Sequence, residues 1–124
     1  QVEALRKDPR IKVVEPDRVV TIFGETTPTG VDRIDADLNL KMDLSPTGIA
    51  IIDTGIWKTH EDLNVAGGVN FTTANRTAWN DDNGHGTHVA GIAAAKAGNG
   101  VGVRGVAPNA RLYAVKVSSQ VWTG

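Results

Sequence analysis

Two histidines lie three residues apart in the stretch DDNGHGTHVAGIAAA, residues 81–95, at the start of a run of small residues. Histidine is the side chain whose ordinary pKa lies nearest to neutral pH, and it serves in proteins both as a general base and as a metal ligand. His85 and His88 could therefore each take part in chemistry. Which chemistry is possible depends on the residues that the rest of the chain brings to them.

One possibility is a zinc site formed by His85 and His88. Zinc-binding histidines on one helix usually lie four residues apart with a glutamate between them. Here the separation is three residues and the intervening pair is Gly-Thr. A third ligand would have to come from His60 or from an aspartate outside any recognisable motif. The spacing therefore gives a zinc site little support. A zinc site and a histidine acting as a general base both remain possible at this point.

The second possibility pairs His85 with Asp53. Asp53 follows the apolar run IAII, residues 49–52, and open α/β sheets collect chemistry at the carboxyl ends of their strands. A carboxylate there can orient a histidine and stabilise its protonated form, as the aspartate of a Ser-His-Asp triad does. The glycines on either side of His85 leave its ring room to reach a strand end. An aspartate that only caps a turn is the competing interpretation.

Hydrophobic patterns predict the elements that would position these residues. The continuous apolar run at 49–52 predicts a strand that is covered on both faces. The Gly- and Ala-rich residues 86–97 predict a helix packed closely on all sides, with Gly91 marking a close approach. Short strands are predicted at 67–71 and 111–117. Strand, helix and strand in this order predict a βαβ crossover and an α/β fold.

Shorter elements are predicted ahead of the first buried strand. The Gly/Thr/Pro-rich residues 24–30 have little to bury and predict a linker at a boundary. Upstream of it we expect a short helix over residues 2–8 and a strand over 11–14. Downstream, Val31, Ile34 and Leu38 have helical spacing within residues 31–40. Loops are predicted at residues 45–48, 72–84 and 98–108.

The composition suits one globular domain or part of a larger one, with 124 residues of which 40% are hydrophobic and 22% charged. A net charge of −1 gives no electrostatic reason to expect nucleic acid or an anionic membrane as partner. No apolar run approaches the roughly 20 residues of a membrane helix. No leader peptide is visible, and Gln1 stands where an initiator methionine would, so we expect sequence upstream. Cysteine is absent, which excludes disulfides, thiolate zinc sites and cysteine nucleophiles.

Three stretches together resemble the subtilisin-like serine proteases: IAIIDTGIWKTHEDL, NGHGTHVAGIAAA and GVRGVAPNARLYAVKV. They occur in the order and at the intervals typical of that family. The resemblance implies the N-terminal portion of a parallel-sheet α/β domain that hydrolyses peptide bonds, with Asp53 and His85 as catalytic residues and His85 as the general base. His88 is then an ordinary helix residue. The resemblance also implies polypeptide substrates, an extracellular location, and a monomer when complete.

The resemblance continues upstream of these stretches. TPTGVDRIDA is similar to the start of the mature protease, and LRKDPRIKVVEPDRVV is similar to the end of the small α+β inhibitory propeptide that precedes it. Residues 1–23 are then the C-terminal part of the propeptide, a partner that occupies the enzyme's own cleft. Residues 24–124 are then the N-terminal part of the peptidase domain. The interval usual in the family places the cleaved bond between Phe23 and Gly24.

The resemblance implies a structural calcium site as well. The residues that match its ligands are Asp62, Asn99, the carbonyls of Ala97, Val101 and Val103, and Glu25. Carboxylate, amide and carbonyl oxygens are the ligands that calcium prefers. A plain Gly-rich turn beside a solvated Asp62 is the alternative.

The nucleophilic serine of the triad is not recognisable in this chain. Of the three serines, Ser45, Ser118 and Ser119, none has the flanking residues that expose a nucleophile on a tight turn. We therefore expect the chain to carry only the aspartate and histidine of a triad, and to be inactive by itself. The alternative function is that of a short product acting as a binding or inhibitory module through residues 1–23.

Two Asn-x-Thr sequons begin at Asn70 and Asn75. They match the acceptor pattern of N-glycosylation. Such tripeptides also arise by chance in a loop rich in asparagine and threonine, so the sequence leaves glycosylation open at both.

Overall fold

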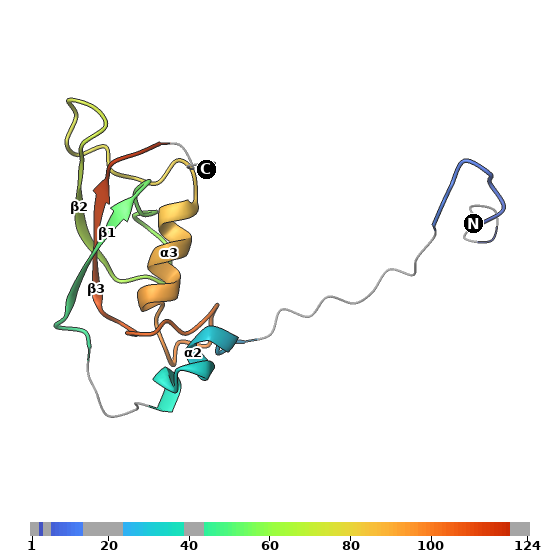
Figure 1. Cartoon of the computed structure of the whole chain (residues 1–124), viewed down its shortest axis with the longest axis horizontal. Coiled ribbons are helices and arrows are strands. Elements are labelled where there is room, and N and C mark those ends of the chain that lie inside the picture. The colour runs from blue at the N-terminus through green and yellow to red at the C-terminus, as the bar shows by residue number, and fades with distance from the viewer. Residues whose placement is uncertain (1–2, 4–5, 14–23, 39–43, 120–124) are drawn as a thin grey trace.

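A three-stranded parallel sheet with one helix against it forms the centre of the molecule (Figure 1). The computed structural model describes residues 3, 6–13, 24–38 and 44–119. In chain order the elements are helix α2 (Thr29–Arg33), the short 3-10 helix η1 (Ala36–Leu38), strand β1 (Gly48–Asp53), strand β2 (Val65–Asn70), helix α3 (His85–Ala94) and strand β3 (Arg111–Lys116). This arrangement confirms the predicted α/β class and parallel sheet. None of the described helices is long and apolar enough to cross a bilayer.

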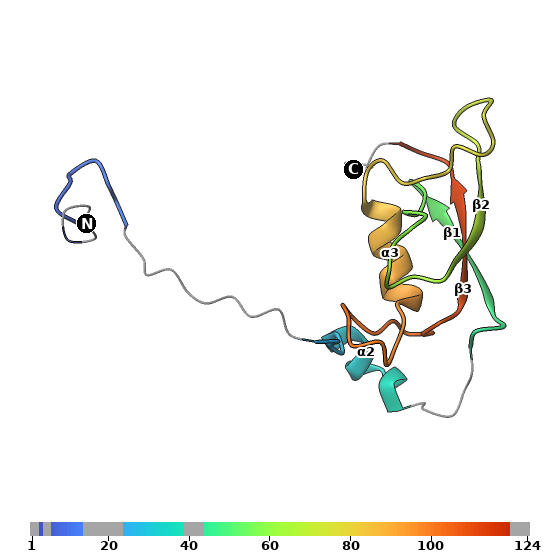
Figure 2. The ribbon, with the colours of Figure 1, turned by 180° about the vertical axis from the view of Figure 1, so that it is seen from behind.

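Strand β3 lies between β1 and β2 and runs parallel to both. Its last residue, Lys116, is opposite Asp53 of β1 and Asn70 of β2. The carboxyl ends of all three strands therefore meet at one edge of the sheet. Helix α3 connects β2 to β3, as the predicted βαβ crossover requires, and it begins at this same edge (Figures 1 and 2).

The core lies between α3 and one face of the sheet. Ile51 of β1 and Leu112 of β3 pack there with Ala90 and Ala94 of the helix. Leu112, Ala90 and Ala94 are all 0% exposed. Because alternate residues of a strand point to opposite faces, the neighbouring Tyr113 lies on the other face and is exposed. The small helix residues let α3 approach the sheet closely.

The prediction that both faces of β1 are covered is wrong for the described part of the chain. Ile52 is 68% exposed because the described helices cover only one face of the sheet. The prediction that α3 is packed on all sides is also wrong for the described residues, since Ile92 is 54% exposed on a side of the helix that faces away from the sheet. A Cβ on Gly91 would meet no atom within 4 Å, so Gly91 marks no close approach here.

Two elements predicted before β1 also differ from the structure. The helical run expected over 31–40 is interrupted after Arg33, and Asp35 takes a left-handed φ of 56°. Among the described residues of this run, 31–38, Val31 alone is buried, while Ile34 and Leu38 are 61% and 70% exposed. The strand expected at 11–14 is absent from its described part, residues 11–13. Of the helix expected over residues 2–8, Glu3 and Arg6 are helical, and residues 2, 4 and 5 lie outside the described residues, as do 14–23.

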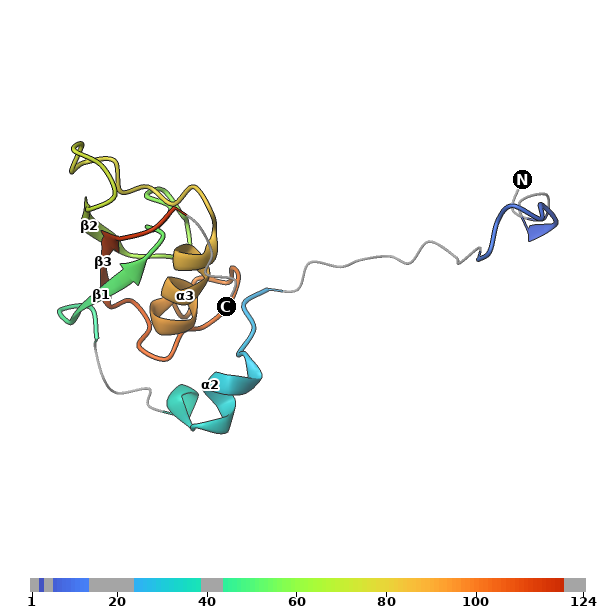
Figure 3. The same ribbon diagram turned by 45° about the horizontal axis from the view of Figure 1, so that its top comes forward.

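The predicted linker, residues 24–30, is hydrogen-bonded to the domain, and its last two residues belong to helix α2. Thr26 pairs with the loop after α3 through two backbone hydrogen bonds, from its amide to the Gly102 carbonyl (3.0 Å) and from the Arg104 amide to its carbonyl (3.0 Å). Helix α2 then begins at Thr29. Figure 3 shows the segment that enters α2 passing this loop. The N-terminal segment is thereby attached to the domain by its backbone.

The two sequons differ in accessibility. Asn70 is 1% exposed, and its amide nitrogen donates to Thr73 Oγ1 and to the Asn75 carbonyl. Its amide oxygen accepts from the amide and the hydroxyl of Thr72. Asn75 lies exposed in the following loop. In the folded chain Asn70 therefore has a structural role and cannot carry a glycan.

We expect the isolated chain of 124 residues to be poorly folded. The sheet leaves one face open, and large apolar side chains such as Ile52, Ile92 and Val117 are exposed, which favours association over a stable monomer. Hydrogen exchange should show weak amide protection, and a dye specific for apolar surface should bind. A sharp cooperative melt of the purified monomer would contradict this expectation.

Candidate active site

Asp53 and His85 are brought together by the carboxyl edge of the sheet. Asp53 is the last residue of β1 and His85 is the first residue of α3. The Nδ1 atom of His85 lies 2.8 Å from Oδ1 and 3.0 Å from Oδ2 of Asp53. The carboxylate therefore accepts the Nδ1 proton, and the second ring nitrogen, Nε2, remains for another partner.

The surroundings of Asp53 keep its carboxyl group ionised. Partial burial raises its pKa, but hydrogen bonds from His85 and the Thr54 amide, together with the charge of protonated His85, lower the pKa by more. The Thr54 amide donates to Asp53 Oδ1 at 2.7 Å. Because the folded-state pKa is lowered, ionised Asp53 stabilises the fold above the pKa of the unfolded chain, and this contribution is lost as the pH falls through the folded-state pKa.

Two glycines allow α3 to begin against the end of β1. Gly55 has a φ of 110°, and a Cβ there would lie 2.5 Å from the Trp79 carbonyl oxygen. A Cβ on Gly86 would lie 2.2 Å from the Gly55 carbonyl oxygen and 3.2 Å from Asp53 Cβ. No side chain fits at these distances. The close approach expected in this helix is therefore at Gly86, next to the histidine.

Sequence reasoning missed Asp81, which lies beneath the start of α3. Its carboxylate accepts hydrogen bonds from the Thr54 hydroxyl (2.9 Å), from the Thr87 amide (2.9 Å) and from the Thr87 hydroxyl. The Asn83 and Gly84 amides donate to it at 3.0 Å each. An aspartate two residues before Asn-Gly is a typical local turn pattern, and this was the available signal.

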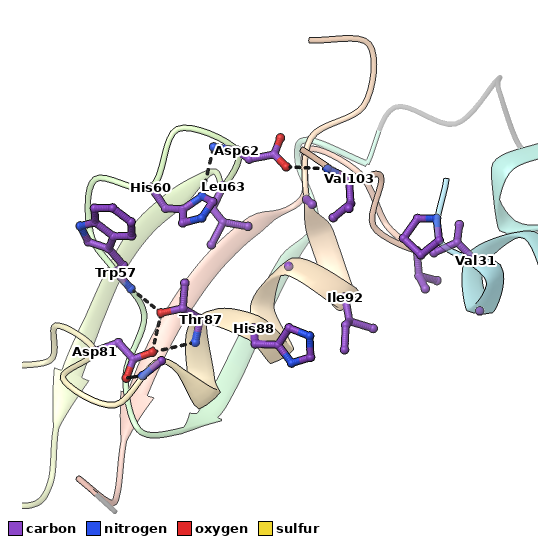
Figure 4. A pocket seen from close by; sticks show the side chains of 16 residues that line it. Val31, Trp57, His60, Asp62, Leu63, Asp81, Thr87, His88, Ile92 and Val103 are labelled. Carbon is purple, nitrogen blue, oxygen red and sulfur yellow. Dashed lines mark hydrogen bonds between the residues drawn. The ribbon is translucent and has the colours of Figure 1, made fainter. Parts of the chain in front are cut away.

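The charge of Asp81 is strongly favoured by these contacts. Burial raises its pKa, but hydrogen bonds from the Thr87 hydroxyl and from the backbone amides of Gly84, Thr87 and Asn83 lower the pKa far below its usual range. Figure 4 shows Asp81 and Thr87 joined in this way, with the Trp57 amide donating to the Thr87 hydroxyl at 3.0 Å.

The other two histidines have different surroundings. His88 is exposed, and its side chain projects from the same side of α3 as Ile92 (Figure 4). The Nδ1 atom of His60 accepts from the Asp62 amide at 3.2 Å, and its ring packs edge-on against Trp57. Over the described residues, no three His, Cys, Asp or Glu side chains form a group that could hold a metal. The geometry gives the zinc interpretation no support.

A profile of the Subtilase family matches residues 45–123, well over half of the chain. The chain belongs to the Subtilase family. It is 48% identical over 118 residues to the alkaline protease of Alkalihalobacillus alcalophilus, a match that covers 94% of this chain and 30% of that protein. It is 40% identical over 125 residues to subtilisin E of Bacillus subtilis, covering 99% of this chain and 32% of that protein.

A third relative extends the comparison to the N-terminus of this subtilase. The thermostable alkaline protease of Halalkalibacterium halodurans is 42% identical over 126 residues, covering 100% of this chain and 34% of that protein. The segment before Gly24 therefore also has a counterpart in that relative. The chain spans about a third of the length of these curated relatives.

A pocket of about 880 Å³ lies beside α3 in this subtilase (Figure 4). Its walls come from α2, α3, the segment after β1 and the loop after α3, and include Val31, Trp57, Leu63, His88, Ile92 and Val106. Asp81 and Thr87 line it, whereas Asp53 and His85 do not. The wall therefore reaches Gly84, the residue before His85, but does not include the Asp–His pair.

The side chains of the expected calcium ligands meet at the loop after α3. Asp62 is 4% exposed, and its Oδ1 and Oδ2 atoms lie 2.7 Å from Asn99 Nδ2 and 3.2 Å from the Val103 amide. Glu25 Oε2 accepts from the amides of Gly98 (2.6 Å) and Asn99 (3.1 Å). Ala97 and Val101 belong to the same loop, and the Val101 amide donates to Asn99 Oδ1 at 3.0 Å. Three oxygen-bearing side chains from distant segments therefore gather there.

We expect the substitution Gly86→Ala to disrupt this subtilase at the start of α3. The added methyl would overlap the Gly55 carbonyl, so the helix must move away from β1, at a cost of about 1–3 kcal/mol or more. Thermal unfolding of the complete gene product measures the effect. The matched control is Gly30→Ala in α2, where a Cβ meets no atom within 4 Å. Equal melting temperatures for the two variants would show that the close approach at Gly86 is not a constraint.

Proposed function

We propose that this chain supplies the aspartate and the histidine of a subtilisin-type serine endopeptidase. The observation that carries the proposal is the contact of His85 Nδ1 with both carboxylate oxygens of Asp53, at 2.8 and 3.0 Å. Membership of the Subtilase family and identity to alkaline proteases and to a subtilisin support it. The substrates are polypeptides, and we place the enzyme outside the cell, acting as a monomer.

The geometry assigns a role to each of the two residues. Asp53 fixes the tautomer of His85 in which Nδ1 carries the proton, so that Nε2 can accept the proton of a serine hydroxyl as it attacks a peptide carbonyl. His85 then donates that proton to the leaving amine, and Asp53 stabilises the transient positive charge without taking the proton. The lowered pKa of Asp53 suits this role because the carboxylate remains charged.

We place the nucleophilic serine outside these 124 residues. Ser45, Ser118 and Ser119 lack the flanking residues of an exposed nucleophile. Without the serine and an oxyanion hole, little rate enhancement is left. The chain by itself is therefore inactive.

The test uses the complete gene product. It should hydrolyse peptides and react with a fluorophosphonate that labels activated serines. The substitution Asp53→Asn should lower kcat by about 10⁴-fold because it leaves the wrong histidine tautomer, and His85→Ala should abolish labelling. Gene product that is folded but neither labelled nor active would overturn the proposal. If it instead bound and inhibited a subtilisin, the inhibitory module would be the better description.

We also propose that the chain contains a processing junction between Phe23 and Gly24. Thr21, Ile22 and Phe23 are β-branched or aromatic, which favours an extended segment that can add to a sheet edge in a cleft. Gly24 leaves the attacked carbonyl uncrowded. The residues before Gly24 lie outside the described part of the structure as far back as position 14, so the support comes from the sequence and from the relatives.

N-terminal sequencing of the secreted, active protein should therefore begin at Gly24 or within a residue or two of it. The same experiment on an inactive His85→Ala variant should show the unprocessed chain, because the enzyme cleaves itself. Fully active protein that still begins upstream of Val13 would contradict the junction.

We further propose a structural calcium ion at the loop after α3. The buried carboxylate of Asp62 contacts an amide group and a backbone N–H, and no ion pair to it occurs among the described residues. The loop surrounds it so tightly that a Cβ on Gly102 would lie 2.5 Å from Asp62 Oδ2. Oxygens from Asp62, Asn99, Glu25 and the loop carbonyls of Ala97, Val101 and Val103 would hold the ion, a donor set that suits calcium. When bound, calcium would neutralise the buried charge and stabilise the loop.

Removal of calcium with EGTA should lower the melting temperature of the complete gene product. If free calcium is present at about 100 times the dissociation constant of the site, the melting temperature should fall by roughly 5–10 °C when EGTA removes it. The variant Asp62→Asn should lose this dependence on calcium, whereas Asp32→Asn, on the exposed side of α2, should keep it. An unchanged melting temperature on addition of EGTA would argue against the site.

A further inference from the structure

The backbone amides at the start of α3 are satisfied by side chains from outside the helix. The first N–H groups of a helix have no partner within the helix. Here the preceding residue is Gly84, which has a φ of 102° and no side chain to cap them. Four side-chain oxygens from outside the helix accept instead, from the amides of its first three residues and of Gly84 before them. They pair as Gly84 N with Asp81 Oδ1 (3.0 Å), His85 N with Asn83 Oδ1 (3.3 Å), Gly86 N with Thr54 Oγ1 (2.9 Å) and Thr87 N with Asp81 Oδ2 (2.9 Å).

Asp81 connects this helix end to the end of β1. One of its oxygens accepts the Thr54 hydroxyl at 2.9 Å, while the Thr54 amide donates to Asp53 Oδ1 at 2.7 Å. Its other oxygen accepts the amide and the hydroxyl of Thr87 in the first turn of α3. The same carboxylate therefore holds the two segments that carry Asp53 and His85.

We propose that Asp81 is a positioning residue, which sets the His85 ring against Asp53 by fixing the first turn of α3 to the end of β1. The inference rests on the proposed function, because the consequence of that position is catalysis by the Asp–His pair. Asp81 does not touch the reacting atoms. It acts through Thr54 on one side and through Thr87 on the other.

The hydrogen bonds require a carboxylate at this position. All five groups that Asp81 contacts are donors, namely the hydroxyls of Thr54 and Thr87 and the amides of Asn83, Gly84 and Thr87. An asparagine has one acceptor oxygen, and its NH₂ group would face donors. A negative charge at the N-terminus of a helix is also stabilising, and asparagine lacks it. The substitution Asp81→Asn therefore keeps the shape of the side chain but removes one acceptor oxygen and the negative charge.

The neighbouring residue provides a matched control. Asp82 is 60% exposed at its side chain, and its carboxylate pairs with Lys116 Nζ at 2.7 Å. Among the described residues its carboxylate has no hydrogen bond to α3. The substitution Asp82→Asn therefore removes the same charge one residue away and leaves the amides of the helix paired. Lys116 Nζ keeps the Asn80 carbonyl as a partner, and the asparagine oxygen can still accept from it.

A second pair of variants tests the same connection through Thr54. The substitution Thr54→Val keeps the volume but removes the hydroxyl that links Asp81 to the Gly86 amide. The substitution Thr54→Ser restores that hydroxyl. A positioning role predicts loss of activity in the valine variant and its recovery in the serine variant.

The experiment measures kcat and KM in the complete gene product, per active site titrated with a fluorophosphonate. Since a displacement of about 1 Å at a catalytic group can cost 10²-fold, we expect Asp81→Asn to lower kcat by roughly 10- to 100-fold. KM should change little. Asp82→Asn and Thr54→Ser should keep kcat within about twofold, and Thr54→Val should follow Asp81→Asn.

A spectroscopic measurement separates positioning from plain stability. The proton on His85 Nδ1, shared with Asp53, should give a low-field NMR resonance that shifts or broadens in Asp81→Asn and not in Asp82→Asn. A variant that melts at a lower temperature but keeps kcat per titrated site, and keeps this resonance unmoved, would overturn the proposal.

Two further outcomes remain informative. If Asp81→Asn does not fold, the Thr54→Val and Thr54→Ser pair decides the question by the same readouts. If the wild-type gene product hydrolyses no peptide, the proposed function fails. The His85 resonance needs no substrate, so its response to Asp81→Asn still supports or refutes the positioning role.

Discussion

The site depends on the close approach between the first turn of α3 and the end of β1. At this point Gly86 lies against the Gly55 carbonyl and beside Asp53, with no space for another atom. An approach this close buries backbone amides, which are costly to leave without partners. The oxygens of Thr54 and Asp81 supply those partners. Packing and hydrogen bonding at one place thus determine where the histidine can lie.

The parallel sheet makes this meeting point possible. Its three strands end together, so that residues 53, 70 and 116 lie in one row. The chain then follows the loop after β2 and starts α3 at the same edge of the sheet. Lys116, 3% exposed, donates from this edge to the backbone carbonyl of Asn80, in the segment that precedes His85. The central strand therefore also holds the loop from which the helix starts. Sequence segments far apart contribute to one rigid arrangement.

Local pattern was enough to predict β1, β2, β3 and α3, because apolar runs and small residues mark segments that pack against one another. The pairing of Asp53 with His85 could also be anticipated, since both residues stand where elements end at the same edge. Asp81 could not be assigned in this way, because its partners come from two other segments and only the fold brings them together. The helix over 31–40 failed at Asp35, where a left-handed φ overrides helical spacing. Exposure of Ile52 could not be foreseen from a continuous apolar run, which does not reveal how many helices cover a sheet.

The buried amide of Asn70 has a consequence for the choice of expression host. Its side chain uses both its nitrogen and its oxygen to fold the loop after β2, yet it sits in a sequon. A yeast or insect secretory pathway modifies such asparagines while the chain is still unfolded, and a sugar attached there would occupy the nitrogen that the loop requires. Material from such a host would divide into a folded, unmodified fraction and a modified fraction unable to close this loop. A bacterial host without that pathway would produce the unmodified protein alone.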